Sequence, residues 1–179
     1  MFDPNTERMI EYWRGRRGEH ALPARDSIDP AGFATFAPRV FIAELRRTGE
    51  ITFRLAGESV EELHGRPLKG VELASLWRPA HRHALALALD ASLANASPLV
   101  IGAHAVTATG PGGTLEILFA PIASPRGVAD LILGFYQASR GGRPVHPPVR
   151  ELSIRRIDGA DARNRPTLRL AAVDGQLIA

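Results

Sequence analysis

Five segments of this chain have the apolar and polar pattern of β-strands. Two of them, Val40 to Arg47 and Ile51 to Ala56, are joined by Gly49-Glu50 and predict a hairpin. The other three follow one another later in the sequence, at Leu99 to Thr109, Thr114 to Ala123 and Ala129 to Ala138. Glycine and proline between neighbouring segments predict tight turns. We therefore expect two strands, an interruption, and three more strands.

Helical patterns occupy the start of the chain and the interruption between the strands. Met9, Ile10 and Trp13 have helical spacing and predict a helix over residues 4–17. Shorter helices are predicted at residues 30–37, where a proline stands at the first position, and at residues 71–77. The expected order is helix, two strands, several helices and three strands.

The longest predicted helix runs from Ala80 to about Asn95 and consists largely of alanine and leucine. Leu85, Leu89 and Leu93 form one stripe, and Leu87 lies well off it. A helix that is apolar on more than one side is buried on more than one side, or it pairs with another chain.

Both faces of the last strands are apolar. The two faces of the fourth strand carry Leu115, Ile117 and Phe119 on one side and Leu118, Ala120 and Ile122 on the other. A sheet of this kind is covered on both sides. The long helix and its short neighbours would form one cover. The helix that contains Trp13 would form the other, unless a second chain supplies it.

The composition suits a soluble globular protein of one domain, with or without a tail. The chain has 179 residues, of which 45% are hydrophobic and 23% charged. It contains no cysteine, which excludes disulfides, thiolate metal sites and cysteine nucleophiles. We find no apolar segment of membrane-spanning length and no signal peptide, and we expect a cytoplasmic location.

The charge is concentrated at the C-terminal end. The whole chain carries a net charge of +3, whereas residues 140–179 hold eight arginines against four acidic residues. A basic tail can contact nucleic acid or an acidic partner. A solvated tail explains the same charges more simply.

Six short motifs carry a resemblance to a known family. They are Trp13, Leu22-Pro23-Ala24-Arg25, Ile28-Asp29-Pro30, Val40-Phe41-Ile42, Phe53-Arg54-Leu55-Ala56-Gly57 and Gly65-Arg66-Pro67-Leu68-Lys69-Gly70. Together they resemble the PAS_5 family of bacterial single-domain PAS proteins, over residues 7 to 138.

The resemblance implies an α+β fold: a PAS-like, five-stranded antiparallel sheet covered by helices. Residues 1–39 would be an N-terminal helical extension, residues 40–139 the PAS-like domain, and residues 140–179 a linker and a basic tail. Two segments of the tail, Leu152 to Ile157 and Leu168 to Val173, have strand patterns. They would form a small appendage or pair with another chain.

The resemblance also implies a non-catalytic sensory or signalling module. It would bind an unknown small molecule, a protein partner for signal output, or both, and we expect a homodimer. We expect no metal, no cofactor and no membrane contact. Haem is the alternative that the resemblance leaves open, because haem-binding PAS relatives take their iron ligand from the region of the long helix. The absence of cysteine excludes a flavin-cysteinyl photosensor.

Seven side chains are candidates for ligand contact: Arg54, His64, Trp77, His81, His104, Phe119 and Phe135. We expect the ligand between the short helices, the long helix and the sheet face that bears His104. An arginine such as Arg54 can bind a ligand carboxylate with two hydrogen bonds, or it can pair with an acid on the covering helix. Two histidines at positions 81 and 83 point to opposite sides of a helix and would not bind one ion together.

The sequence leaves two other functions open. A small enzyme could use His104 with an acid to move a proton on a hydrophobic substrate, but the order of the elements argues against such folds. Nucleic acid could bind the tail arginines, but no aromatic residues alternate with them.

Overall fold

The computed structural model describes residues 1–108, 110–140, 144–160, 172–173 and 176–177. Its helices are α1 (Pro4–Arg17), α2 (Glu58–His64) and α3 (Pro79–Ala94), with 3₁₀ segments η1 (Arg25–Ser27), η2 (Pro30–Arg39) and η3 (Leu73–Leu76). Its main strands are β1 (Val40–Leu45), β2 (Ile51–Ala56), β3 (Leu99–Thr107), β4 (Gly110–Ile122), β5 (Leu131–Ala138) and β6 (Val149–Gly159). None of the helices within the described residues is long and apolar enough to cross a membrane.

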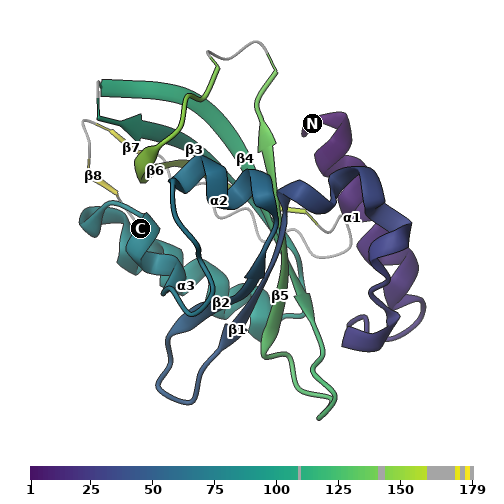
Figure 1. The fold of residues 1–179 in the computed structure, drawn as a ribbon. Coiled ribbons are helices and arrows are strands. Elements are labelled where there is room, and N and C mark those ends of the chain that lie inside the picture. The colour runs from purple at the N-terminus through teal and green to yellow at the C-terminus, as the bar shows by residue number, and fades with distance from the viewer. Residues whose placement is uncertain (109, 141–143, 161–171, 174–175, 178–179) are drawn as a thin grey trace.

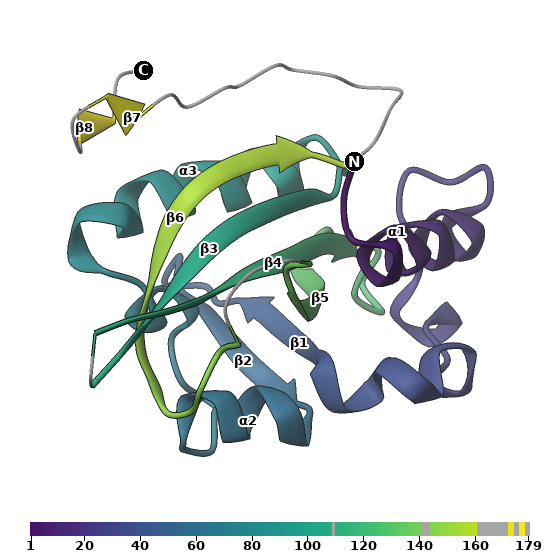
Figure 2. The ribbon, with the colours of Figure 1, turned by 90° about the horizontal axis from the view of Figure 1, so that it is seen from above.

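The six strands form one antiparallel sheet in the order β2-β1-β5-β4-β3-β6. Helix α1 lies on the opposite side of the sheet from α3 (Figures 1 and 2). We call the face covered by α2, η3 and α3 the inner face, and the face covered by α1 and η2 the outer face. The predicted α+β class and the antiparallel sheet are confirmed.

The sheet has six strands, so the expectation of five is corrected. The segment predicted at Leu152 to Ile157 is part of β6, which pairs with β3 from Leu99↔Gly159 to Thr107↔Val149. It is neither an appendage nor a pairing element for another chain. The physical reason is burial, because Leu152 is fully buried and Ile154 and Ile157 pack against the inner core. Without β6, the edge of β3 would be open.

The second predicted tail strand, Leu168 to Val173, lies mostly outside the described residues. Its last two residues form β7 (Ala172–Val173), which pairs with β8 (Gln176–Leu177).

The two apolar faces predicted for the late strands are confirmed. Leu115, Ile117 and Phe119 belong to the inner core, and Leu118, Ala120 and Ile122 belong to the outer core. The cover of the outer face is α1 of the same chain. Its Trp13 is fully buried, and the indole Nε1 donates a hydrogen bond of 2.6 Å to the carbonyl of Pro121 in β4.

Local signals account for where the helices begin. Asp3 precedes α1, and its Oδ1 accepts the Asn5 N–H at 2.9 Å. Asp29 precedes η2 and accepts the Ala31 N–H at 2.9 Å. In α3, the predicted leucine stripe is buried, but Leu87 is 58% exposed. The helix is therefore buried on one side only.

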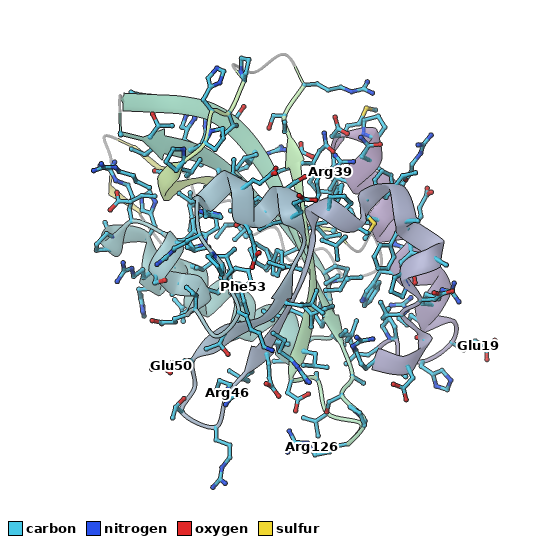
Figure 3. The ribbon with its side chains drawn as sticks, viewed as in Figure 1. Glu19, Arg39, Arg46, Glu50, Phe53 and Arg126 are labelled. Carbon is cyan, nitrogen blue, oxygen red and sulfur yellow. The ribbon has the colours of Figure 1, made fainter. Side chains whose placement is uncertain are left out.

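The centre of the inner face is occupied by an aromatic cluster around Phe41. Phe41 of β1 pairs with Gly134 of β5, which pairs in turn with Phe119 of β4. The Phe41 ring lies directly over Gly134, because a Cβ atom at that glycine would be 1.9 Å from Phe41 Cζ. From there it contacts Phe53, Phe119 and Tyr136, with ring centroids 5.1, 5.8 and 5.8 Å away. Figure 3 shows Phe53 in the middle of this layer.

Replacing Gly134 by alanine should destabilise the protein, because the new methyl group overlaps the Phe41 ring. Overpacking of this kind costs about 1–3 kcal/mol, and we expect Gly134→Ala at the upper end of that range in urea denaturation.

Gly15→Ala is the matched control, since nothing lies within 4 Å of the added Cβ. Gly15 lies in the last turn of α1, where this change should stabilise the protein by no more than roughly 0.5–1 kcal/mol. Equal effects of the two substitutions would show that Phe41 does not lie on Gly134.

Candidate functional site

The seven residues predicted to contact a ligand do not form one site. The inner layer contains His64, Trp77 and Phe119, and the outer face carries His104 and Phe135. Arg54 lies at the solvent surface, and His81 lies at the contact between α3 and β6.

The inner layer brings His64, Trp77 and Phe119 into one buried core. Trp77 follows η3 and is 1% exposed, and Phe119 packs edge-on against Phe41. His64 ends α2 and is 6% exposed, and its Nε2 lies 3.2 Å from the Tyr136 hydroxyl. No local sequence pattern links Tyr136 to His64, because 72 positions separate them.

Burial keeps this histidine–tyrosine pair uncharged near neutral pH. It lowers the pKa of His64 to about 4, with a further lowering by the Arg66 cation and a partial opposing effect of a hydrogen bond to the Val149 backbone. Burial also raises the pKa of Tyr136 well above its ordinary value. With its proton on Nδ1, a neutral His64 accepts the Tyr136 O–H through Nε2.

His81 covers the free edge of β6. Its Nδ1 accepts the Ile154 N–H at 2.9 Å, and the neighbouring Arg78 N–H donates to the Leu152 carbonyl at 2.9 Å. Burial and the Arg78 cation lower the pKa of His81, which favours the neutral form that can accept this bond. Masking of an edge strand prevents unwanted pairing with other chains. The ring is therefore turned to β6 and not into the core.

His104 lies on the outer face and not beside the α3 helix. Its Nε2 accepts a hydrogen bond of 2.7 Å from Nη1 of Arg155, and burial and that cation lower the pKa of His104. Phe135 is also on the outer face, because it pairs with Leu118. Its ring lies 5.4 Å from that of Phe36.

Arg54 is at the surface of β2, the other edge strand. Its side chain is 53% exposed, and its Nη1 is 3.8 Å from Glu44 Oε1. This is a surface ion pair of small energetic value. It corresponds to the alternative in which the arginine pairs with an acid of the protein, although that acid is on β1 and not on a helix.

A groove of about 770 Å³ lies on the outer face, beside the first turn of α1. Its floor comes from β3 and β4, and its walls come from α1 on one side and β6 on the other. Two buried carboxylates, Asp3 and Glu116, lie in it. The sequence pattern gave no sign of this site, because 113 positions separate the two acids. A smaller cavity of about 280 Å³ lies between the β1–β2 turn, η3 and α3.

Acidification should destabilise the protein through His64. The unfolded chain takes up a proton near pH 6.5 and the folded chain only near pH 4, so stability is complete above pH 6.5 and falls as the pH drops through this window. A shift of this size corresponds to about 3 kcal/mol. We expect urea denaturation at several pH values to show the loss, and expect His64→Gln to reduce it.

His83→Gln is the control, because that histidine is exposed on α3. A pH dependence that His64→Gln and His83→Gln leave equally unchanged would show that His64 is not the buried neutral group described above.

Comparison with known proteins gives a family and a set of distant folds. The family model PAS_5, described as a PAS domain, matches residues 1–137. None of the curated proteins matches the chain.

Three similar solved structures are remote from this chain in sequence. A light-oxygen-voltage domain studied with a flavin analogue is 13% identical, with 62% of this chain and 84% of that chain covered and a TM-score of 0.48. The PAS domain of a protein from Colwellia psychrerythraea is 17% identical, with coverage of 62% and 97% and a TM-score of 0.45. The N-terminal domain of a diguanylate cyclase with a PAS/PAC sensor from Marinobacter aquaeolei is 13% identical, with coverage of 56% and 94% and a TM-score of 0.41.

The family match spans most of the chain, including α1 and all strands up to β5. PAS domains are generally sensory, non-catalytic modules. This chain belongs to the PAS_5 family of PAS-domain proteins.

Proposed function

We propose that this protein is a non-catalytic signalling PAS module whose inner face is filled by its own side chains, and that its signal passes through the outer surface to a protein partner. The observation that supports this most is the position of Phe41 over Gly134. The ring fills the middle of the layer between sheet and helices, where Phe53 and Trp77 also pack. A bulky cofactor would have to displace these rings.

The residues of the inner layer do not fit flavin or haem. The chain has no cysteine to form a flavin adduct. For haem, the candidate ligand His81 already accepts the Ile154 N–H, and His64 is hydrogen bonded to Tyr136. Freeing either ring would break a buried or half-buried hydrogen bond, at a cost of about 1–3 kcal/mol.

A catalytic role for His104 has little support. A general base of this kind is normally oriented by a carboxylate, whereas His104 accepts a hydrogen bond from the cation Arg155. Nucleic-acid binding by the tail also has little support from the described residues. Four of the tail arginines, at positions 143, 163, 165 and 169, lie outside them. The three-part division at residues 39 and 139 and the cytoplasmic location remain predictions.

Cofactor binding tests the proposal. The purified protein should be colourless, native mass spectrometry should give a whole multiple of the polypeptide mass with no flavin or haem added, and titration with flavin mononucleotide or haemin should give no saturable complex. Phe41→Ala should open an apolar cavity of about the size of the lost ring, and benzene should then raise the melting temperature of the variant but not of the native protein. A stoichiometric flavin or haem complex of the native protein would overturn the filled inner face.

A homodimer through α3 is proposed as the second part of the function. The side of α3 that faces solvent carries Ala80, Ala84, Leu87, Ala91 and Ala94. Their alternating spacing of four and three residues is the one that antiparallel or parallel helix pairs use. Asp90 is the one acidic or basic residue between Ala84 and Ala94 on this helix. A second copy of the same helix would cover the exposed Leu87.

Leu87→Arg should therefore abolish or weaken self-association at least tenfold, because it puts a charge into the centre of this row. Light scattering across a concentration series measures the effect, and Arg46→Ala, in the β1–β2 turn, is the control. A native protein that stays monomeric, or a dimer that Leu87→Arg leaves intact, would exclude α3 as the dimer contact.

A further inference from the structure

We propose that the groove on the outer face binds a small organic anion, which presents a carboxylate or phosphate to the arginines of the groove and rests its apolar part on Phe2. This inference deepens the proposed function, because a module with a filled inner face needs another place for a small ligand. The volume of about 770 Å³ is that of a small-molecule site.

The buried acids of the groove have their oxygen atoms engaged by the protein itself. Asp3 Oδ1 accepts the Asn5 N–H, and Asp3 Oδ2 is 3.2 Å from Arg140 Nε. Glu116 Oε2 accepts the Asp3 N–H at 2.8 Å, and Glu116 Oε1 accepts from Arg156 Nη2 at 3.1 Å. Because the oxygen atoms of both acids already have partners within the protein, they are poorly placed to bind a cationic ligand.

The arginines of the groove, in contrast, have donors to spare. Among the described residues, Arg8 has no hydrogen-bond or ion-pair partner, and Arg155 uses one nitrogen for His104. Within the part of the chain that the structure describes, Arg140 contacts Asp3 through its Nε atom. A guanidinium offers five N–H donors in a plane that matches a carboxylate or phosphate. The surplus of donors favours an acceptor-rich, anionic ligand.

The backbone of β3 positions the basic wall. The side chain of Arg156 lies flat across Gly102, since a Cβ there would be 2.8 Å from Arg156 Cγ. The guanidinium reaches over the Phe2 ring, 5.9 Å from its centroid. Beside it, β6 has an irregularity opposite Gly102 and Ala103. Because of this irregularity, the consecutive residues Arg155 and Arg156 both line the groove.

The acids on the α1 wall divide the groove into two ends. Glu7 uses one oxygen to accept the Phe2 N–H at 3.1 Å, and Glu11 has no partner among the described residues. They repel an anion from their own part of the wall, so the anion is directed to the cations Arg8, Arg155 and Arg140. A cationic ligand would instead bind beside Glu7 and Glu11. The sign of the charge on the bound ligand therefore shows which end of the groove is the binding site.

Hexanoate, hexyl phosphate and hexylamine are suitable probes, because they share an apolar part and differ in the head group. Amide chemical shifts of the full-length protein should move saturably with one or both anions at Gly102, Thr114 and Ser139. Hexylamine should leave these amides unchanged. Hexanoate alone would assign a carboxylate ligand, and hexyl phosphate alone a phosphate ligand. Inorganic phosphate measures how much of the affinity comes from the head group.

The Arg155→Ala and Arg8→Ala variants should each weaken anion binding at least tenfold. Both side chains are exposed, so both variants should fold. Arg46→Ala is the matched control, because Figure 3 places Arg46 in the β1–β2 turn, far from α1. No saturable anion binding, binding of hexylamine in place of the anions, or equal affinity of all three variants would overturn the inference. The proposed function would fail through a different result, namely binding of flavin or haem on the inner face.

Discussion

The structure depends on the close approach of Phe41 to Gly134. Only a residue without a side chain lets the ring lie over Gly134 of the neighbouring strand, and from that position the ring contacts Tyr136 of the same strand and Phe119 of the next one. The contact links β1, β5 and β4 in one row and fixes their register. It also fills the space that separates the sheet from its inner helices. The buried His64–Tyr136 hydrogen bond lies at the border of this packed layer.

Because the inner face is filled by apolar side chains, the groove with its charged side chains lies on the outer face. Helix α1 covers the middle of that face through Met9, Ile10 and Trp13 and leaves β3 and β6 partly open beside its first turn. The helix is held at this end by Asp3, which caps it and also binds Glu116 of the sheet. A ligand or partner at the groove would therefore act on the contact between helix and sheet, which is a direct way to transmit a signal.

The sequence predicted the elements well and their spatial relations less well. Alternation in β4 and β5 assigned Leu115 and Leu118 to opposite faces, and both assignments are confirmed. Alternation cannot say which helix covers which face, however, so His104 was expected beside α3 and lies on the other side. The proline-rich segment before Val149 indicated a linker, so the strand after it was not expected to join the sheet. That strand is β6, which pairs with β3. Contacts between distant positions, such as Asp3 with Glu116 or His81 with Ile154, leave no local pattern.

A crystal structure of the purified protein would test the filled inner face most directly. The account predicts the Phe41 ring flat against Gly134, in contact with Phe53, Phe119 and Tyr136, with no additional electron density between the sheet and helices α2 and α3. A Phe41 side chain turned away from Gly134, with density for a bound molecule in its place, would contradict it.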